Sequence, residues 1–313
     1  MSKLVLASQG ALSREVLASQ GVLSRGLLAS QGVLSRDVRA ALAAACLEIA
    51  EHASKVALAG FGTRPAVREK GRHDLLTEFD LKSQAAVLQL LAERYPGVPV
   101  IAEEGDAANV SPGNELTFVV DPIDGTTNFA HGHPFWCVSV GVLSRGEPVA
   151  GGIAAPALAM NWHGFRFDGG GELYKNGEAR RVSETARLDD ALIATGFPPN
   201  RDRAPDNNFD SFMAVKRRAL AVRRCGSAAI DLAFVADGTY DAYWERRLML
   251  WDSAAAAAFV LAAGGKVTAL DGGPADYAKG NIVASNGLVH DELVAAVTGR
   301  AADGGAAPAP TPR

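Results

Sequence analysis

The sequence predicts a mixed fold of α-helices and β-strands arranged in two lobes. Residues 37–58 and 81–95 carry apolar side chains at helical spacing. Residues 98–167 contain five short apolar stretches typical of strands, which we expect to form an antiparallel sheet. From residue 187 onward, strand-like segments alternate with helical ones, which indicates a second sheet packed with helices. A chain of 313 residues that is 48% hydrophobic can bury a core of that size.

The amino end consists of three near-identical copies of one short unit. LASQGALSR at residues 6–14 is followed by LASQGVLSR at 17–25 and again at 28–36, with a period of 11 residues. Such a period can support a right-handed helical supercoil, but each copy holds few large apolar residues to bury. The near identity indicates duplication of coding sequence or a start site placed too early. We expect residues 1–36 to be a dispensable, mobile or marginally helical extension, with self-association as the alternative.

The remaining elements follow in order, and their ranges define the expected domain. After the two helices, strands are expected at residues 98–102, 117–120, 136–143, 148–154 and 161–167. In the second lobe they are expected at residues 192–194, 221–223, 242–244 and 266–268. The catalytic domain is therefore expected to span residues 37–300, with lobes of about 37–185 and 186–300. The Ala/Gly/Pro-rich tail, residues 301–313, is expected to be disordered.

The most informative motif is TFVVDPIDGTTNF at residues 117–129. An apolar strand leads into Asp121 and Asp124, and the intervening proline and following glycine favour a turn at its carboxyl end. Two carboxylates on one turn repel unless a cation neutralises them, and oxygen ligands suit hard divalent ions. Gly125, Thr126 and Thr127 then offer backbone N–H groups and hydroxyls to an anion. A site that binds both a metal ion and an anion indicates phosphate chemistry. The same residues could also form an ordinary surface turn.

Three further segments carry acidic residues in a matching context. VPVIAEE at residues 98–104 is a strand ending in Glu103 and Glu104, and HDLLTEFDLK at 73–82 places Asp80 after a threonine. LMLWDSAAAAAFVLAAG at residues 248–264 opens an alanine-rich helix with Asp252. Glu104 is interpreted as a residue behind the metal ligands or as a surface group, and not as a direct ligand. Aspartate is also a common N-cap residue, so Asp252 could have a capping role as well.

Together these four segments resemble the inositol monophosphatase family, within the magnesium-dependent, lithium-sensitive phosphatase superfamily that includes the fructose bisphosphatases. The resemblance covers residues 36–297 and implies a layered α-β-α-β-α fold with an antiparallel first sheet, a mixed second sheet and a site between the lobes. It also implies a homodimer and two or three Mg²⁺ ions per site. The metal ligands it implies are Glu103, Asp121, the backbone carbonyl of Ile123, Asp124 and Asp252.

The resemblance assigns the remaining roles as well. Asp80 and Thr126 match the pair that activates the attacking water, so Asp80, Thr126 and Glu103 are the expected catalytic residues. The expected substrate contacts are Gly125, Thr126, Gly226, Ser227, Ala228 and Glu245. Gly125 and Thr126 would hold the phosphate at a helix amino end, whose dipole favours anions. Ser227 and Gly226 could instead be simple helix caps.

Composition excludes other classes of function. A net charge of −4 gives no basic footprint for nucleic acid, and no apolar run reaches membrane-spanning length. Three isolated cysteines favour reduced thiols in the cytoplasm, and His131 with His133 lies in a loop context that argues against metal binding.

The leading hypothesis is therefore a cytoplasmic Mg²⁺-dependent inositol-phosphate phosphatase, acting by metal-activated water and in-line displacement. The same chemistry on fructose 1,6-bisphosphate, histidinol phosphate, nucleotide 3′-phosphate or NADP is the alternative. A binding or regulatory protein on a phosphatase scaffold is the third hypothesis, and the complete acidic set argues against it.

Overall fold

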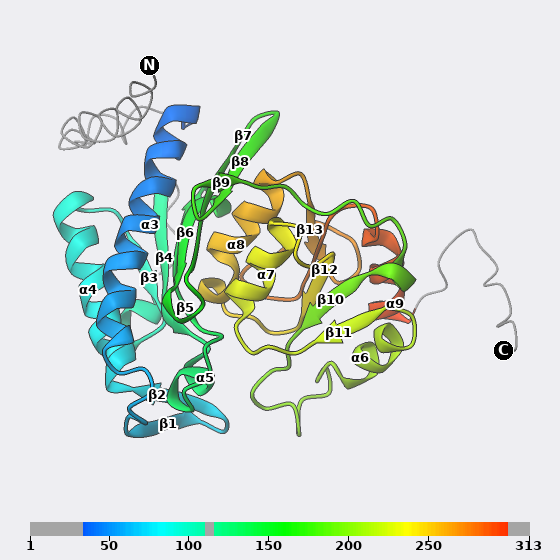
Figure 1. Ribbon diagram of the computed structural model, residues 1–313, viewed down its shortest axis with the longest axis horizontal. Coiled ribbons are helices and arrows are strands. Elements are labelled where there is room, and N and C mark those ends of the chain that lie inside the picture. The colour runs from blue at the N-terminus through cyan, green and yellow to red at the C-terminus, as the bar shows by residue number, and fades with distance from the viewer. Residues whose placement is uncertain (1–33, 110–115, 300–313) are drawn as a thin grey trace, which may run out of the picture.

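The structure is a computed structural model that describes residues 34–109 and 116–299, and its elements form five layers (Figure 1). The outer layer on one side contains α3 (Arg36–Leu58) and α4 (Glu78–Arg94), which cover a seven-stranded sheet. Next come α7 (Ala228–Ala236) and α8 (Leu250–Ala262), then a five-stranded sheet, and finally α6 (Phe209–Lys216) and α9 (His290–Thr298). The expected α-β-α-β-α order is confirmed. Residues 1–33, which hold the first two repeats and most of the third, lie outside the described residues, as does the tail.

The first sheet is mostly antiparallel, as expected, with one exception at its edge. Its strand order is β3-β4-β5-β6-β7-β8-β9, and β3 pairs with β4 in parallel. The bounds are β3 Val100–Ala102, β4 Leu116–Asp124, β5 Cys137–Ser144, β6 Glu147–Ala155, β7 Met160–Phe167, β8 Gly170–Lys175 and β9 Glu178–Ala179. The sequence analysis did not predict β8 or β9.

The second sheet is mixed, with strand order β11-β10-β12-β14-β13. Strand β10 runs parallel to both β11 and β12, whereas β14 is antiparallel to β12 and β13. The bounds are β10 Leu192–Thr195, β11 Ala221–Arg223, β12 Ala242–Glu245, β13 Lys266–Ala269 and β14 Ile282–Ser285. Strand β14 was not predicted, although it is fully buried between its two neighbours.

Helix α3 begins where the third repeat ends, and it packs tightly on the first sheet. Ser35 is its N-cap and accepts a hydrogen bond from the backbone N–H of Val38 at 3.3 Å. At the contact, a Cβ added to Gly152 of β6 would lie 2.1 Å from the Leu47 backbone nitrogen. On the other face, a Cβ at Gly151 would lie 2.7 Å from the Ala255 Cβ of α8. Glycines therefore allow the helices on both faces to approach the sheet closely.

Two local features differ from the expected boundaries. Helix α4 starts at Glu78, three residues before the predicted start, because Thr77 and Asp80 form a reciprocal capping box there. Strand β4 extends through the expected turn to Asp124, with a shift in its pairing to β5 between Asp121 and Asp124. Pro122, which has no N–H to donate, lies within that shift. The irregular stretch brings both aspartates to the same end of the strand.

A two-stranded hairpin precedes α4 and contacts α5 (Thr126–Ala130). Strand β1 (Val67–Gly71) pairs antiparallel with β2 (Asp74–Thr77), and this hairpin was not predicted. It carries Lys70, whose contacts are described below. Within the described ranges, none of the helices combines the length and hydropathy needed to cross a bilayer.

Candidate active site

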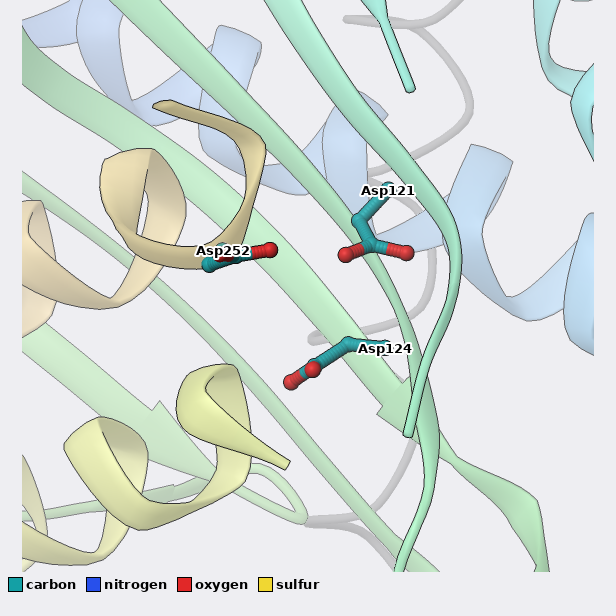
Figure 2. A group of neighbouring side chains, drawn as sticks. All are labelled: Asp121, Asp124 and Asp252. Carbon is teal, nitrogen blue, oxygen red and sulfur yellow. The ribbon is translucent and has the colours of Figure 1, made fainter. Parts of the chain in front are cut away.

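Three carboxylates from two distant parts of the chain converge at the end of β4. Asp121 and Asp124 come from that strand, and Asp252 comes from the first turn of α8 (Figure 2). One carboxylate oxygen of each lies within 4.8 Å of the others, and the group is the kind that can hold a metal ion. The three expected aspartate ligands are thus brought together.

Backbone and hydroxyl donors fix the orientation of each aspartate. Asp121 Oδ1 accepts the backbone N–H of Ile123 at 3.0 Å, and Asp252 Oδ2 accepts that of Met249 at 2.7 Å. Asp124 is tied to the amino end of α7. Its Oδ2 accepts from Ser227 Oγ at 2.6 Å and Ala229 N at 2.7 Å, and its Oδ1 accepts from Ala228 N at 3.3 Å. Ser227 is also the N-cap of α7, so the expected capping and site roles coexist.

Among the described residues, none of the three aspartates forms an ion pair with a basic side chain, and their charges repel one another. Burial raises the pKa of Asp121 well above its usual value, and the carboxylates of Glu103, Asp124 and Asp252 raise it further. Burial and repulsion from Asp124 likewise raise the pKa of Asp252 well above its usual value. Burial raises the pKa of Asp124 to about 6 despite its hydrogen bonds to α7. An all-oxygen, mutually repelling donor set fits a hard divalent cation.

Glu103, the fourth expected carboxylate ligand, forms an ion pair with a lysine. Its Oε1 lies 2.6 Å from Lys70 Nζ, which also contacts Glu104 Oε1 at 2.8 Å. Burial raises the pKa of Glu103 to about 7. The charge of Lys70 opposes this rise, and the charge of Glu104 adds to it. Glu103 is outside the three-carboxylate group, although its charge acts on Asp121 and Asp252. Glu104 is buried and exchanges two hydrogen bonds with Gln84, so it is not a surface group.

Asp80 and Thr126 meet beside the cluster, as the resemblance implied. Thr126 Oγ1 lies 3.0 Å from Asp80 Oδ1 and 3.0 Å from the carbonyl oxygen of Ile123. The other oxygen of Asp80 accepts two hydrogen bonds from Thr77. Burial raises the pKa of Asp80, and these hydrogen bonds oppose the shift. A fully buried carboxylate with a raised pKa is suited to accepting a proton.

Gly125 connects the cluster to a short helix, α5 (Thr126–Ala130), for which it is the N-cap. Its φ of 96° lies in the left-handed region. A Cβ at this position would also lie 3.0 Å from the Phe135 carbonyl oxygen. Both constraints require glycine at position 125. Helix α5 supplies the helix amino end that was expected beside the phosphate.

An acidic cavity of about 440 Å³ opens onto part of the carboxylate group. It contains Glu103, Asp124 and Asp252 together with the expected substrate residues Gly226, Ser227, Ala228 and Glu245. Glu245 accepts a hydrogen bond from the Tyr243 hydroxyl, and burial raises its pKa to about 7. A larger cavity of about 880 Å³ beside residues 269–281 contains none of the candidate site residues.

The sequence analysis missed three residues at this site. Lys70 contacts both glutamates, Arg224 lines the acidic cavity, and Asp231 lines it with a buried Oδ1 that has no hydrogen-bond partner in the described structure. Arg224 and Asp231 flank the motif GSAA, which could have drawn attention to them. Lys70 lies on the unpredicted hairpin, and no local pattern indicates its role.

Comparison with known proteins agrees with this geometry. Residues 37–301 match the Inositol monophosphatase family. An inositol-1-monophosphatase from Synechocystis is 41% identical over 74% of this chain and 80% of its own length. The chloroplastic phosphatase IMPL1 of Arabidopsis thaliana is 37% identical over 79% of this chain and 68% of its own. The solved inositol monophosphatase of Anabaena is 35% identical and superposes with a TM-score of 0.73, covering 84% of this chain and 98% of that one. The chain therefore belongs to the inositol monophosphatase family, whose members are phosphoric monoester hydrolases.

Proposed function

We propose that the protein is a magnesium-dependent phosphomonoesterase that hydrolyses inositol monophosphate. The observation that carries the proposal is the group of three carboxylates within 4.8 Å of one another, beside the Asp80–Thr126 pair. The names of the relatives from Synechocystis and Anabaena support the choice of substrate. The same chemistry on another phosphate ester is the alternative that a substrate panel must test.

The chain offers the ligands for two or three Mg²⁺ ions. Those ligands would be Glu103, Asp121, the carbonyl of Ile123, Asp124 and Asp252. When bound, the ions would offset the carboxylate charge and act as Lewis acids toward the phosphate ester and water. Lys70 forms an ion pair with Glu103 in the protein without metal. We expect a metal ion to displace Lys70 from that carboxylate.

The neighbouring groups would then position the nucleophile and move its proton. A water beside Thr126 would donate its proton to Oγ1 as that hydroxyl passes its own proton to Asp80 Oδ1, 3.0 Å away. The resulting hydroxide would form a bond to phosphorus in line with the ester oxygen, whose bond to phosphorus breaks. The released alkoxide would take up a proton from solvent water. Backbone N–H groups of Gly125 and Thr126 would hold the phosphate oxygens.

The part of the acidic cavity around Glu245 would bind the alcohol part of the substrate. Glu245 lies there with Gly226, Ser227 and Ala228. Its carboxylate already accepts from Tyr243 and retains acceptor capacity for a substrate hydroxyl. A polyol is favoured because it can supply hydroxyl donors to this carboxylate.

The test is phosphate release from a panel of substrates under three conditions. Inositol 1-phosphate, fructose 1,6-bisphosphate, histidinol phosphate, nucleotide 3′-phosphates and NADP are compared with Mg²⁺, with chelator and with added Li⁺. We expect Mg²⁺-dependent, Li⁺-inhibited release that is fastest from inositol 1-phosphate. Faster release from another compound would make that compound the proposed substrate in place of inositol 1-phosphate. No release at all would contradict the proposed activity.

Asp121→Asn tests the metal assignment in the same assay. Removing one ligand charge should lower kcat/KM by more than about 100-fold, because even partners outside the ligand set alter metal sites 10- to 100-fold. Asp37→Asn is the matched control, because its side chain is 94% exposed at the start of α3. Near-normal turnover by Asp121→Asn would contradict the assignment.

We also propose a homodimer, which the family resemblance supports, located in the cytoplasm, which the three free cysteines favour. Light scattering on the purified full chain measures the mass in solution, and a monomer at all concentrations would contradict the dimer.

A further inference from the structure

Glu245 lies where two parallel strands of the second sheet end side by side. Strand β10 ends at Thr195 and β12 ends at Glu245, and Thr195 is paired with Trp244. The Glu245 carboxylate packs directly on Gly196, because a Cβ added to that glycine would overlap the carboxylate. A small shift of either strand end would therefore move the side chain that is proposed to bind a substrate hydroxyl.

One buried amide links the two strand ends. Asn208 is 3% exposed, and its Nδ2 donates to the Gly196 carbonyl oxygen at 2.7 Å and to Thr195 Oγ1 at 2.9 Å. Its Oδ1 accepts from Trp244 Nε1 at 2.7 Å. Thr195 Oγ1 in turn donates to the Trp244 carbonyl oxygen at 2.6 Å, which closes a ring of hydrogen bonds. The amide thus contacts the residue on which Glu245 packs and the residue that precedes Glu245 in the chain.

Asn208 is the N-cap of α6, yet its side chain does not cap that helix. Asparagine at an N-cap usually accepts a hydrogen bond from a backbone N–H of the first turn, and within the described part of the chain this side chain forms none. Its φ of 76° lies in the left-handed region, which is uncommon for a residue other than glycine. A residue that keeps a strained backbone and forgoes its usual capping role beside a site indicates a functional constraint.

The same amide joins the two ends of the loop 196–208, which forms part of the wall of the acidic cavity. The loop contributes four residues to that wall: Gly196, Phe197, Pro198 and Pro199. Because Asn208 donates to Gly196, the end of the loop is bound to its beginning. This contact fixes the part of the wall on which Glu245 rests.

We propose that Asn208 is a positioning residue, which acts through Gly196 and Trp244 to hold the Glu245 carboxylate where a hydroxyl of the substrate can donate to it. Asn208 is not among the residues that line the acidic cavity, so it acts without touching the substrate. The inference rests on the proposed function, which assigns the alcohol part of the substrate to Glu245. Loss of the amide should weaken the preference for an alcohol that carries hydroxyls and leave the phosphate chemistry in place.

Binding is measured separately from turnover, with two esters of the same ring size. In the slow variant Asp80→Asn with Mg²⁺, isothermal titration calorimetry compares inositol 1-phosphate with cyclohexyl phosphate, which lacks the ring hydroxyls. We expect the inositol ester to bind about tenfold more tightly or better, because hydrogen bonds to charged groups are the stronger ones. Adding Asn208→Ala or Asn208→Asp should reduce that ratio about fivefold or more, because neither alanine nor an ionised aspartate can donate to Gly196.

Ser211→Ala is the matched control, because Ser211 is a buried polar residue of the same helix that donates to Val297 instead. It should lower Tm, as Asn208→Ala does, while the affinity ratio stays within about twofold. In a Glu245→Ala background, adding Asn208→Ala should not change the ratio further, because the amide acts through that carboxylate.

Three results would overturn the inference. The first is equal binding of the two esters before Asn208 is changed. The second is a ratio that Asn208→Ala leaves unchanged or that Ser211→Ala lowers equally, because the role would then be absent or merely structural. The third is a further fall in the ratio when Asn208→Ala is added to Glu245→Ala.

Turnover by the chain with Asp80 intact separates this inference from the proposed function. Asn208→Ala should raise KM for inositol 1-phosphate about fivefold or more and change kcat by less than about twofold, because the Asp80–Thr126 pair is untouched. Release from both esters with an unchanged preference in Asn208→Ala would overturn the inference alone. No release from either ester, together with an Asn208-dependent binding preference, would support the positioning role and overturn the proposed activity.

Discussion

The hydroxyl of Thr126 has one proton and two acceptors at equal distance. Asp80 Oδ1 and the Ile123 carbonyl oxygen both lie 3.0 Å from its Oγ1. Donation to Asp80 leaves the oxygen free to accept a proton from water, whereas donation to Ile123 would occupy the carbonyl that is proposed as a metal ligand. The choice of acceptor therefore couples the proton path to metal binding at a single side chain.

Thr126→Ala should remove this proton path and leave the carboxylate cluster in place. We expect kcat to fall by about 10²- to 10⁴-fold, the usual contribution of general acid–base catalysis, with a smaller change in KM. Steady-state phosphate release measures both constants. Thr126→Ser retains the hydroxyl and should recover most of kcat; a Thr126→Ala enzyme with near-normal kcat would contradict the proton path.

At the scale of elements, the site depends on how closely α3 and α8 approach the first sheet. Gly152 meets the α3 backbone on one face, and Gly151 meets Ala255 of α8 on the other. Because α8 also carries Asp252, its position on the sheet sets the distance between that residue and the aspartates of β4. Close packing of helix on sheet thus determines the geometry of the carboxylate group.

Gly152→Ala should destabilise the fold by forcing α3 away from β6. Overpacking of this kind costs about 1–3 kcal/mol, which lowers Tm by several degrees in a domain of this size. Thermal unfolding followed by circular dichroism measures the change. The control is Gly170→Ala, where the new Cβ would meet only the Phe167 ring at 3.5 Å. Equal Tm values for the two variants would show that the close approach is not maintained in solution.

Elements with strong local patterns could be predicted, whereas those defined by distant partners could not. Helix α3 and strands β4 to β7 have regular apolar spacing, and Asp121 and Asp124 lie within one motif. Short edge strands such as β9 are stabilised by pairing with a neighbour, so their own residues give little signal. Lys70 contacts Glu103 across 33 residues of sequence, and Asp231 reaches the acidic cavity from helix α7. Their positions depend on tertiary packing rather than on local sequence.

At the scale of the whole molecule, the acidic groups make the stability of the metal-free protein depend on pH. Burial raises the pKa of Glu103 and Glu245 to about 7 and of Asp124 to about 6. A carboxyl group with a raised folded-state pKa binds protons more strongly in the folded state than in the unfolded state. Its stabilising contribution is present at low pH and is lost as the pH rises through the folded-state value.

Buried histidines act in the opposite direction, but at lower pH. Burial lowers the pKa of His290 to about 4 and also lowers that of His163. Their protonation in the unfolded state therefore destabilises the fold mainly below the ordinary histidine pKa of about 6.5. Between pH 6.5 and 8 the effect of the carboxylates therefore exceeds that of the histidines.

We expect the Tm of the protein in chelator to fall as the pH rises from about 6.5 to 8. With Mg²⁺ the trend should reverse, because metal ligands must be deprotonated and binding stabilises the folded state. The Mg²⁺-induced rise in Tm should therefore grow across this window and be largely lost in Asp121→Asn. Differential scanning fluorimetry at fixed ionic strength measures all three effects. A Mg²⁺-induced rise that is independent of pH, or retained in Asp121→Asn, would mean that the ions bind elsewhere than at these carboxylates.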